Sequence, residues 1–190
     1  MRQMLSHQEY VGNRLSSLTP DKGALFLCAV SQRQVPVYEL FAADQRWGHV
    51  AGFRDLMQQC WAAALSPGTS TRPAHPNAED FISSDFGQSG SSLAIEAYSS
   101  LEVLIGILNG EPISAAPVEY AYTILDSYLY GTLGLATVSA ENDAAVDAHP
   151  LTVQEMQRQT RALDDISSTS WRAADWASWR DKAAQQSLLS

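Results

Sequence analysis

Residues 19–65 read TPDKGALFLCAVSQRQVPVYELFAADQRWGHVAGFRDLMQQCWAAAL, and this stretch organises the predicted fold. Thr19 and Pro20 predict a helix start, because Thr caps free amides and Pro at the first helical position loses no hydrogen bond. Pro36 predicts a break just before it, because proline has no amide hydrogen and disfavours helical backbone at the preceding residue. The expected helices are therefore 20–34 and 37–46.

The end of this stretch carries apolar side chains at spacings of three and four, which predicts a helix over 50–65. These side chains are Val50, Phe53, Met57, Cys60, Trp61 and Ala64. Related patterns predict helices over 4–18, 92–109, 117–136 and 150–166 and a last helix around Trp176, and no segment alternates as a strand would. We therefore expect an all-α fold, a single compact domain over 1–190 of seven or eight helices, with a loop at 66–76 that is rich in Pro, Gly and Ser.

The amino-acid composition predicts a folded globular protein. With 45% hydrophobic and 17% charged residues over 190 positions, the chain can bury a substantial core and is not predicted to be disordered. Cys28 and Cys60 lie in apolar helical patterns and read as buried free thiols, with a disulfide between them as the alternative. The first residues lack the apolar run of a signal peptide, and no run of apolar residues is long enough to span a membrane. We expect a cytoplasmic protein with no membrane partner.

Charge is distributed unevenly along the chain. The net charge is −9, and residues 73–157 contain no Lys or Arg but twelve Asp or Glu residues. A surface of one sign repels nucleic-acid phosphates and suits a basic protein partner. The simpler interpretation is that the acidic residues only favour solubility.

The helix predicted over 117–136 places acidic and aromatic residues on its outer side. Tyrosines can anchor an interface while carboxylates steer a basic partner. The predicted partner-binding residues are Glu79, Asp80, Asp85, Glu119, Tyr120, Asp126 and Tyr130. The alternative is that Tyr120 and Tyr130 pack under a neighbouring helix.

The sequence contains no set of residues that indicates a reaction, so we expect a protein that is not an enzyme and uses no cofactor. The four histidines are scattered, and a metal site built from Glu79, Asp80 and Glu119 is a less simple explanation than solvated acids. Arg33 either binds an anion at the start of the helix at Pro36 or ties two helices together through a carboxylate or carbonyl. Thr152 and Glu155 stand at the spacing of a capping box.

Several of these residues also carry a resemblance to the bacterial domain-of-unknown-function 416 family. The resembling positions are Arg14, Leu15, Gln32, Arg33, Pro36, Tyr38, Phe41, Trp47, Trp61, Ala94 to Ala97, His149 to Leu151, Glu155 and Gln159. The resemblance implies an all-helical fold and supplies no catalytic residues. The loop near Ser66 and the Trp-rich C-terminal part depart from it.

These observations lead to one favoured function and two alternatives. We expect an interaction protein that covers a basic partner through its acidic helical surface, in particular an immunity protein that neutralises a cognate bacterial toxin. The resemblance adds an analogy, since members of such families also occur as immunity genes beside toxins. The first alternative is a small-molecule-binding or enzymatic protein that uses an interhelical pocket near Arg33, with an acid as the second polar group. The second is a helical adaptor or homodimer.

Overall fold

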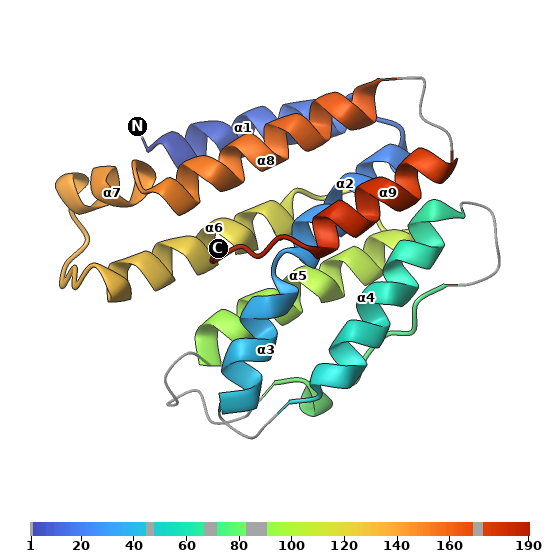
Figure 1. Cartoon of the computed structure of the whole chain (residues 1–190), viewed down its shortest axis with the longest axis horizontal. Coiled ribbons are helices and arrows are strands. Elements are labelled where there is room, and N and C mark those ends of the chain that lie inside the picture. Colours follow the sequence, from blue (N-terminus) through green and yellow to red (C-terminus); the bar gives the residue numbers. More distant parts are fainter. Residues whose placement is uncertain (1, 45–47, 67–71, 83–90, 169–172) are drawn as a thin grey trace.

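Helix α2 (Pro20–Gln32) is the centre of the fold, and all of its residues from Gly23 to Ser31 are buried. The computed structural model describes residues 2–44, 48–66, 72–82, 91–168 and 173–190. In it, α2 contacts α4 (Val50–Leu65), α5 (Ser91–Leu108), α6 (Ala116–Thr132), α8 (Pro150–Ser167) and α9 (Ala173–Ala184) (Figure 1). A helix that is apolar on all sides is stable only when other elements surround it, and α2 meets that condition.

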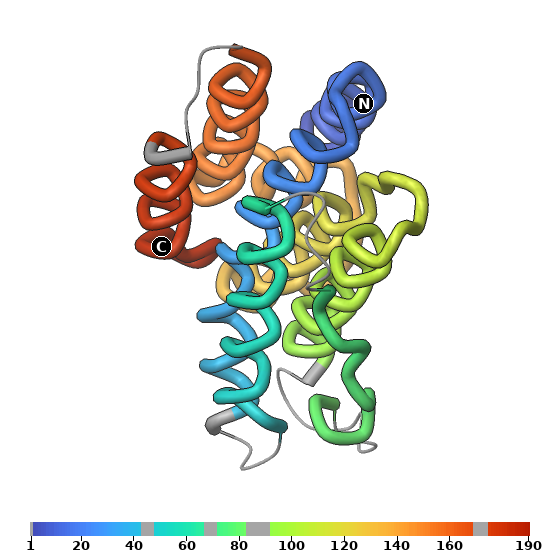
Figure 2. Tube along the Cα trace, turned by 90° about the vertical axis from the view of Figure 1, so that its right-hand side faces the viewer, coloured from blue at the N-terminus to red at the C-terminus, as the bar shows by residue number. Residues whose placement is uncertain are grey.

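The remaining helices form two ends around this centre. Helix α1 (Gln3–Ser16) lies beside α8 at one end, and α3 (Val35–Asp44) lies with α4 at the other, as Figures 1 and 2 both show. The short helix α7 (Ala140–Asp147) connects α6 to α8, and a 3-10 turn, η1 (Ala78–Asp80), precedes α5. The predicted all-α fold in a single helical domain is confirmed, with no strand in the ranges that the structure describes.

The predicted break between α2 and α3 exists, but it lies at residues 33–34, and Val35, which the sequence placed outside the helical region, is the first residue of α3. Helix α2 begins at Pro20 and ends at Gln32, and α3 begins at Val35. The side chain of Thr19 makes no capping hydrogen bond, whereas its carbonyl oxygen accepts from the amide of Gly23 at 2.9 Å. The side chain of Gln34, which lies in the bend, is buried and attaches the bend to α6, because its Nε2 donates to the carbonyl oxygen of Pro117 at 3.0 Å.

Two further segments differ from the sequence prediction. Helix α6 ends at Thr132 instead of continuing to residue 136, and Gly134 turns the chain with a φ of +66°, a conformation that glycine adopts without strain. Leu133 is accordingly 43% exposed and lies outside the core. The acidic segment 139–149 contains the additional helix α7, whose first turn is capped by the Ser139 hydroxyl oxygen accepting from the Asn142 amide at 3.2 Å.

The segment predicted as a loop, 66–76, is described only in part. Residues 67–71 lie outside the described ranges, and residues 72–76 have no regular secondary structure. Arg72 donates to the carbonyl oxygen of Asn109 at 3.1 Å, and the Asn109 side chain donates to the carbonyl oxygen of Pro73 at 3.1 Å. These bonds attach the second half of the segment to the end of α5.

Candidate functional site

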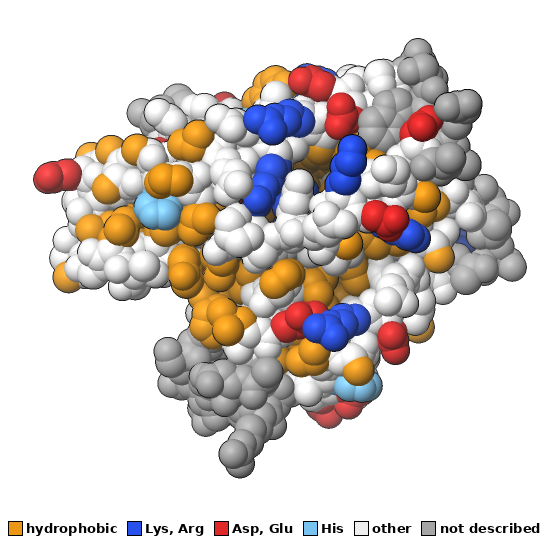
Figure 3. Space-filling model, in the orientation of Figure 1, with side chains coloured by type: hydrophobic (Ala, Val, Ile, Leu, Met, Phe, Trp, Pro, Cys, Tyr) orange, Lys and Arg blue, Asp and Glu red, His pale blue; other side chains and the backbone are white. Residues whose placement is uncertain are grey.

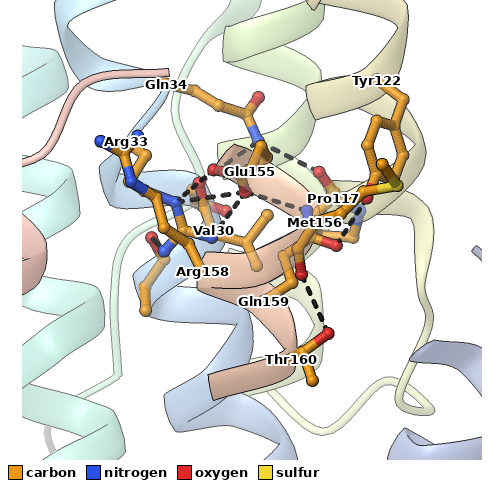
Figure 4. A network of polar contacts seen from close by, with 12 residues as sticks. Val30, Arg33, Gln34, Pro117, Tyr122, Glu155, Met156, Arg158, Gln159 and Thr160 are labelled. Atoms are coloured by element: carbon orange, nitrogen blue, oxygen red, sulfur yellow. Dashed lines mark hydrogen bonds and ion pairs between the residues drawn. The ribbon is translucent and has the colours of Figure 1, made fainter. Parts of the chain in front are cut away.

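A buried ion pair joins α2 to α8 (Figure 4). Nη2 of Arg33 lies 2.6 Å from Oε1 of Glu155, and Nε of Arg33 donates to Oε2 at 2.9 Å. The side chains are only 2% and 1% exposed, and Nη1 of Arg33 donates to the carbonyl oxygen of Ala29 at 3.0 Å. Of the two roles considered for Arg33, the structure confirms that it ties helices together through a carboxylate.

The role of Glu155 corrects the prediction of a capping box with Thr152. The start of α8 is capped by His149, whose Nδ1 accepts from the Leu151 amide at 3.3 Å. The Thr152 hydroxyl instead donates to the carbonyl oxygen of Val146 at 2.8 Å. Glu155 is unavailable as a cap because its carboxylate faces inward toward Arg33.

A chain of buried hydrogen bonds extends from this ion pair toward α6 (Figure 4). Gln159 Nε2 donates to Oε1 of Glu155 at 2.9 Å, and the Tyr122 hydroxyl donates to Oε1 of Gln159 at 3.1 Å. The half-buried ring of His7 stands edge-on to Tyr122 with 6.2 Å between the ring centroids. Burial lowers the pKa of His7 and raises the pKa of Tyr122. Nε2 of His7 is buried without a hydrogen-bond partner in the described ranges, whereas the bonds among Arg33, Glu155, Gln159 and Tyr122 hold α2, α8 and α6 in one arrangement.

A cleft of about 550 Å³ opens beside this network, and we call it the α8–α9 cleft. Its first wall is one face of α8, with side chains at spacings of three and four: Arg158, Arg161, Ala162 and Asp165. Its second wall is one face of α9, which includes Asp175, Trp179, Lys182 and Ala183. The floor comes from α2, with Ala29 and Arg33.

Small side chains account for the hollow. Each of the three helices contributes an alanine to the lining, namely Ala29, Ala162 and Ala183, and all three are buried. A methyl group leaves open the volume that a leucine would occupy where helices face one another. The cleft is therefore a consequence of residue size at three positions that lie far apart in the sequence.

The charge at this cleft is opposite in sign to that of the whole chain. Arg158 donates to the carbonyl oxygens of Ser187 at 2.8 Å and Ser190 at 3.1 Å. The side chains of Arg161 and Lys182 make no hydrogen bond or ion pair with any residue in the described part of the chain, and both residues are exposed. Figure 3 shows Lys and Arg side chains grouped over α8 and α9, although the net charge of the protein is −9.

The predicted partner-binding residues fall into separate places. Glu79 and Asp80 are exposed on η1, whereas Asp85 lies outside the described ranges. Glu119 is exposed at the start of α6, and Tyr120 beside it is half-buried. Burial, together with the negative charges of Glu96 and Glu102 on α5 and of Glu119 on α6, raises the pKa of Tyr120.

Asp126 and Tyr130 do not present the free surface that the sequence predicted. Arg2 folds back from the start of the chain and forms an ion pair with Asp126, and it also lies 3.6 Å from a carboxylate oxygen of Asp143. The Tyr130 hydroxyl donates to Asp143 at 2.7 Å. A cation at position 2 can neutralise residues more than a hundred positions away only because α1 packs against α6.

Sequence reasoning did not find most of the α8–α9 cleft. The spacing of Arg158, Arg161 and Asp165 places them on one helix face, as does the spacing of Trp179 and Lys182. The sequence therefore shows that these residues share a helix face, but the same spacing is typical of a face that is simply exposed to solvent. Only the packing of both helices against Ala29 turns the two faces toward a shared hollow.

No group of three His, Cys, Asp or Glu side chains in the described ranges is placed to hold a metal ion, so Glu79, Asp80 and Glu119 do not converge. No helix in those ranges is both long enough and apolar enough to cross a membrane.

Comparison with known proteins identifies the family. The chain is similar to the crystal structure of a DUF416 family protein from Shewanella baltica OS155, with a TM-score of 0.71 and 22% sequence identity over 90% of this chain and 91% of that one. Comparison with curated proteins gave no match. The model of the family described as protein of unknown function (DUF416) matches residues 11–187. Because that match covers nearly the whole sequence, the chain belongs to the DUF416 family.

Proposed function

We propose that this protein binds a small molecule in the α8–α9 cleft, without carrying out a reaction on it. The observation that carries the proposal is the cleft itself, whose volume of about 550 Å³ lies within the range of roughly 300–1,000 Å³ that small-molecule sites occupy. Its lining combines apolar side chains with a few polar groups that converge from three helices. This combination is typical of sites that bind ligands specifically.

The buried network supports the same function. Arg33 and Glu155 hold α2 and α8 in a fixed arrangement, and Gln159 and Tyr122 extend that constraint to α6. A site whose walls are fixed before the ligand arrives loses less conformational entropy on binding. The sequence suggested an interhelical pocket near Arg33 with an acid as the second polar group. The α8–α9 cleft lies beside Arg33, and the acid that Arg33 contacts, Glu155, forms a buried ion pair with it.

A cleft-filling substitution tests the proposal. Ala162→Leu and Ala183→Leu each place an isobutyl group in the hollow, whereas Ala62→Leu adds the same group to an exposed position on α4. The unfolding temperature of the three variants and the original protein is measured across a panel of metabolites, because a ligand that binds the folded state raises it. We expect ligand shifts in the original protein and in Ala62→Leu and none in the cleft-filling variants. Equal shifts in all four proteins, or no shift in any, would overturn the proposal.

A second candidate function rests on a separate observation, the unpaired carboxylates of α5 and α6. Glu96, Glu102 and Glu119 form no ion pair with a cation in the described ranges, and Glu102 and Glu119 are exposed. A basic protein could pair with them and use Tyr120, whose pKa their charges raise, as an anchor. In this role the protein would be a cytoplasmic immunity protein that covers a cognate toxin. Glu79 and Asp80 would extend the contact surface, whereas Asp126 and Tyr130 are already engaged by Arg2 and Asp143.

Charge reversal tests this second candidate. Glu102→Lys and Glu119→Lys change the surface around Tyr120, and Glu141→Lys makes the same change at an exposed position on α7. The variants are coexpressed with the product of a toxin-like gene adjacent to the gene for this chain. Loss of protection with the first two variants only would support the immunity function, and protection by all three would count against it.

A further inference from the structure

We infer that the ligand of the α8–α9 cleft is an organic anion whose carboxylate or phosphate group lies between Arg161 and Lys182 and whose apolar body lies against Ala29, Ala162 and Ala183. This inference rests on the proposed function and specifies the chemical class of its ligand. It follows from which cations at the cleft already have partners, from where the acids lie, and from the apolar lining.

The cations at the cleft differ in what they can still bind. Arg33 is neutralised by Glu155 and is 2% exposed, so it contributes no net charge to a ligand. Arg158 already donates two hydrogen bonds to main-chain oxygens of residues 187 and 190. Arg161 on α8 and Lys182 on α9 remain exposed, with no side-chain partner in the described part of the chain. These two side chains come from opposite walls, which is the arrangement that holds an anionic group from two sides.

The acids in the lining limit what kind of anion fits. Asp165 stands one helical turn beyond Arg161 on α8, and Asp175 lies two helical turns before Lys182 on α9. They repel a ligand that carries negative charge along its whole length, such as a nucleic-acid strand. The net charge of −9 adds to that repulsion. A compact anion with its charge at one end avoids both carboxylates.

The apolar lining of the cleft suits an apolar body. Ala29 on the floor and Ala162 and Ala183 on the walls present methyl groups, and Trp179 lies in the same lining with 9% of its surface exposed. Trp179 is held in place by edge-on contacts with Trp61 and Trp176, each with 6.0 Å between ring centroids. A planar or aliphatic group laid on this surface would remove apolar area from water while its anionic end stays at the rim.

The test uses probes that separate the two halves of such a ligand. Phenyl phosphate and benzoate carry both an anionic group and an apolar body, inorganic phosphate carries only the first, and benzyl alcohol carries only the second. Binding of each is measured by isothermal titration calorimetry at two salt concentrations. We expect phenyl phosphate or benzoate to bind at least tenfold more tightly than inorganic phosphate or benzyl alcohol, and the affinity to fall as salt rises.

Matched variants assign that affinity to the cleft. Arg161→Gln and Lys182→Gln each remove one cation from the rim, and Arg180→Gln makes an equal charge change on α9 at a residue that does not line the α8–α9 cleft. We expect the first two variants to lose about tenfold in affinity for the anionic probe, and Arg180→Gln to lose little. Because Arg161, Lys182 and Arg180 lie at the surface, all three variants should fold, which circular dichroism verifies.

Failure of this inference is distinguishable from failure of the proposed function. If Ala162→Leu abolishes binding of a neutral probe while Arg161→Gln and Lys182→Gln leave it unchanged, the cleft binds a ligand but the ligand is not an anion. If all charge variants, including Arg180→Gln, weaken binding equally, the anion interacts with the surface non-specifically and the inference is wrong. If Ala162→Leu and the charge variants all bind as the original protein does, the proposed function and the inference both fail.

Discussion

Arg33 and Glu155 form an ion pair across 122 positions of the sequence, with Nη2 and Oε1 2.6 Å apart and both side chains buried. The pair joins the central helix α2 to α8 and lies beside the α8–α9 cleft. Removing two charges from water costs free energy, and the pair offsets that cost only because Gln159 and the carbonyl oxygen of Ala29 satisfy further bonding groups.

Breaking this pair should destabilise the protein strongly. Glu155→Leu leaves the guanidinium of Arg33 buried without a counter-charge, and we expect the free energy of unfolding to fall by about 3–5 kcal/mol. Urea denaturation measures the change. The double variant Arg33→Met with Glu155→Leu should recover most of the loss, because no charge then remains buried. Arg54→Met removes one partner of the exposed ion pair with Glu39 and serves as the control, with a much smaller effect.

Stability should fall on acidification because of His7. Burial lowers the pKa of His7 in the folded protein below its ordinary value near 6.5, so the unfolded chain binds the proton first as the pH falls. The contribution of His7 is present above about pH 6.5 and is lost progressively as the pH falls through the folded-state pKa. His7→Gln should therefore show a flatter dependence of unfolding free energy on pH between 7 and 5. The exposed residue His75 provides the control variant His75→Gln, and an identical slope in His7→Gln and the original protein would contradict the prediction.

The two thiols should be unreactive in the folded protein. Cys28 and Cys60 are free and buried, and burial raises the pKa of Cys60 to about 12 and that of Cys28 above its ordinary value. Only the thiolate reacts readily with alkylating reagents, and its population at neutral pH is then negligible. We expect iodoacetamide to label neither residue in native buffer and both in concentrated urea, as measured by mass spectrometry. Labelling at equal rates in both conditions would show that the thiols are accessible.

Arg2 should stabilise the contact between α1 and the α6–α7 segment. It lies among the carboxylates of Asp126, Asp143 and Asp147, which repel one another without it. Arg2→Gln should lower the free energy of unfolding by about 1 kcal/mol, because the group is partly exposed and screened by solvent. Added salt should reduce the difference from the original protein, because it screens the remaining repulsion. A difference that does not change with salt would indicate that Arg2 acts through packing instead.

The sequence determined the local structure of this protein. Thr19 and Pro20 mark the start of α2, and Pro150 begins α8, because proline is tolerated in the first turn of a helix, where its missing amide hydrogen is not needed. Pro36 likewise lies in the first turn of α3, although the break precedes Val35 and not Pro36 itself. The apolar stripe on α4 correctly identified Phe53 and Cys60 as buried. Helix α7 was missed, because a short polar helix has almost no apolar periodicity and its stability depends on the cap at Ser139.

Tertiary structure alone decided which charges are neutralised and where the cleft lies. Along the chain, Asp126 is far from any basic residue and Glu155 looks like part of a helix cap, yet Arg2 and Arg33 reach them because packing places distant helices side by side. Local patterns depend on dihedral angles and near neighbours, so they can be read from the sequence. Contacts among α2, α8 and α9 depend on how the three helices pack together. Ala29, Ala162 and Ala183 give no signal in the sequence, and they line one cleft only because packing brings their helices together.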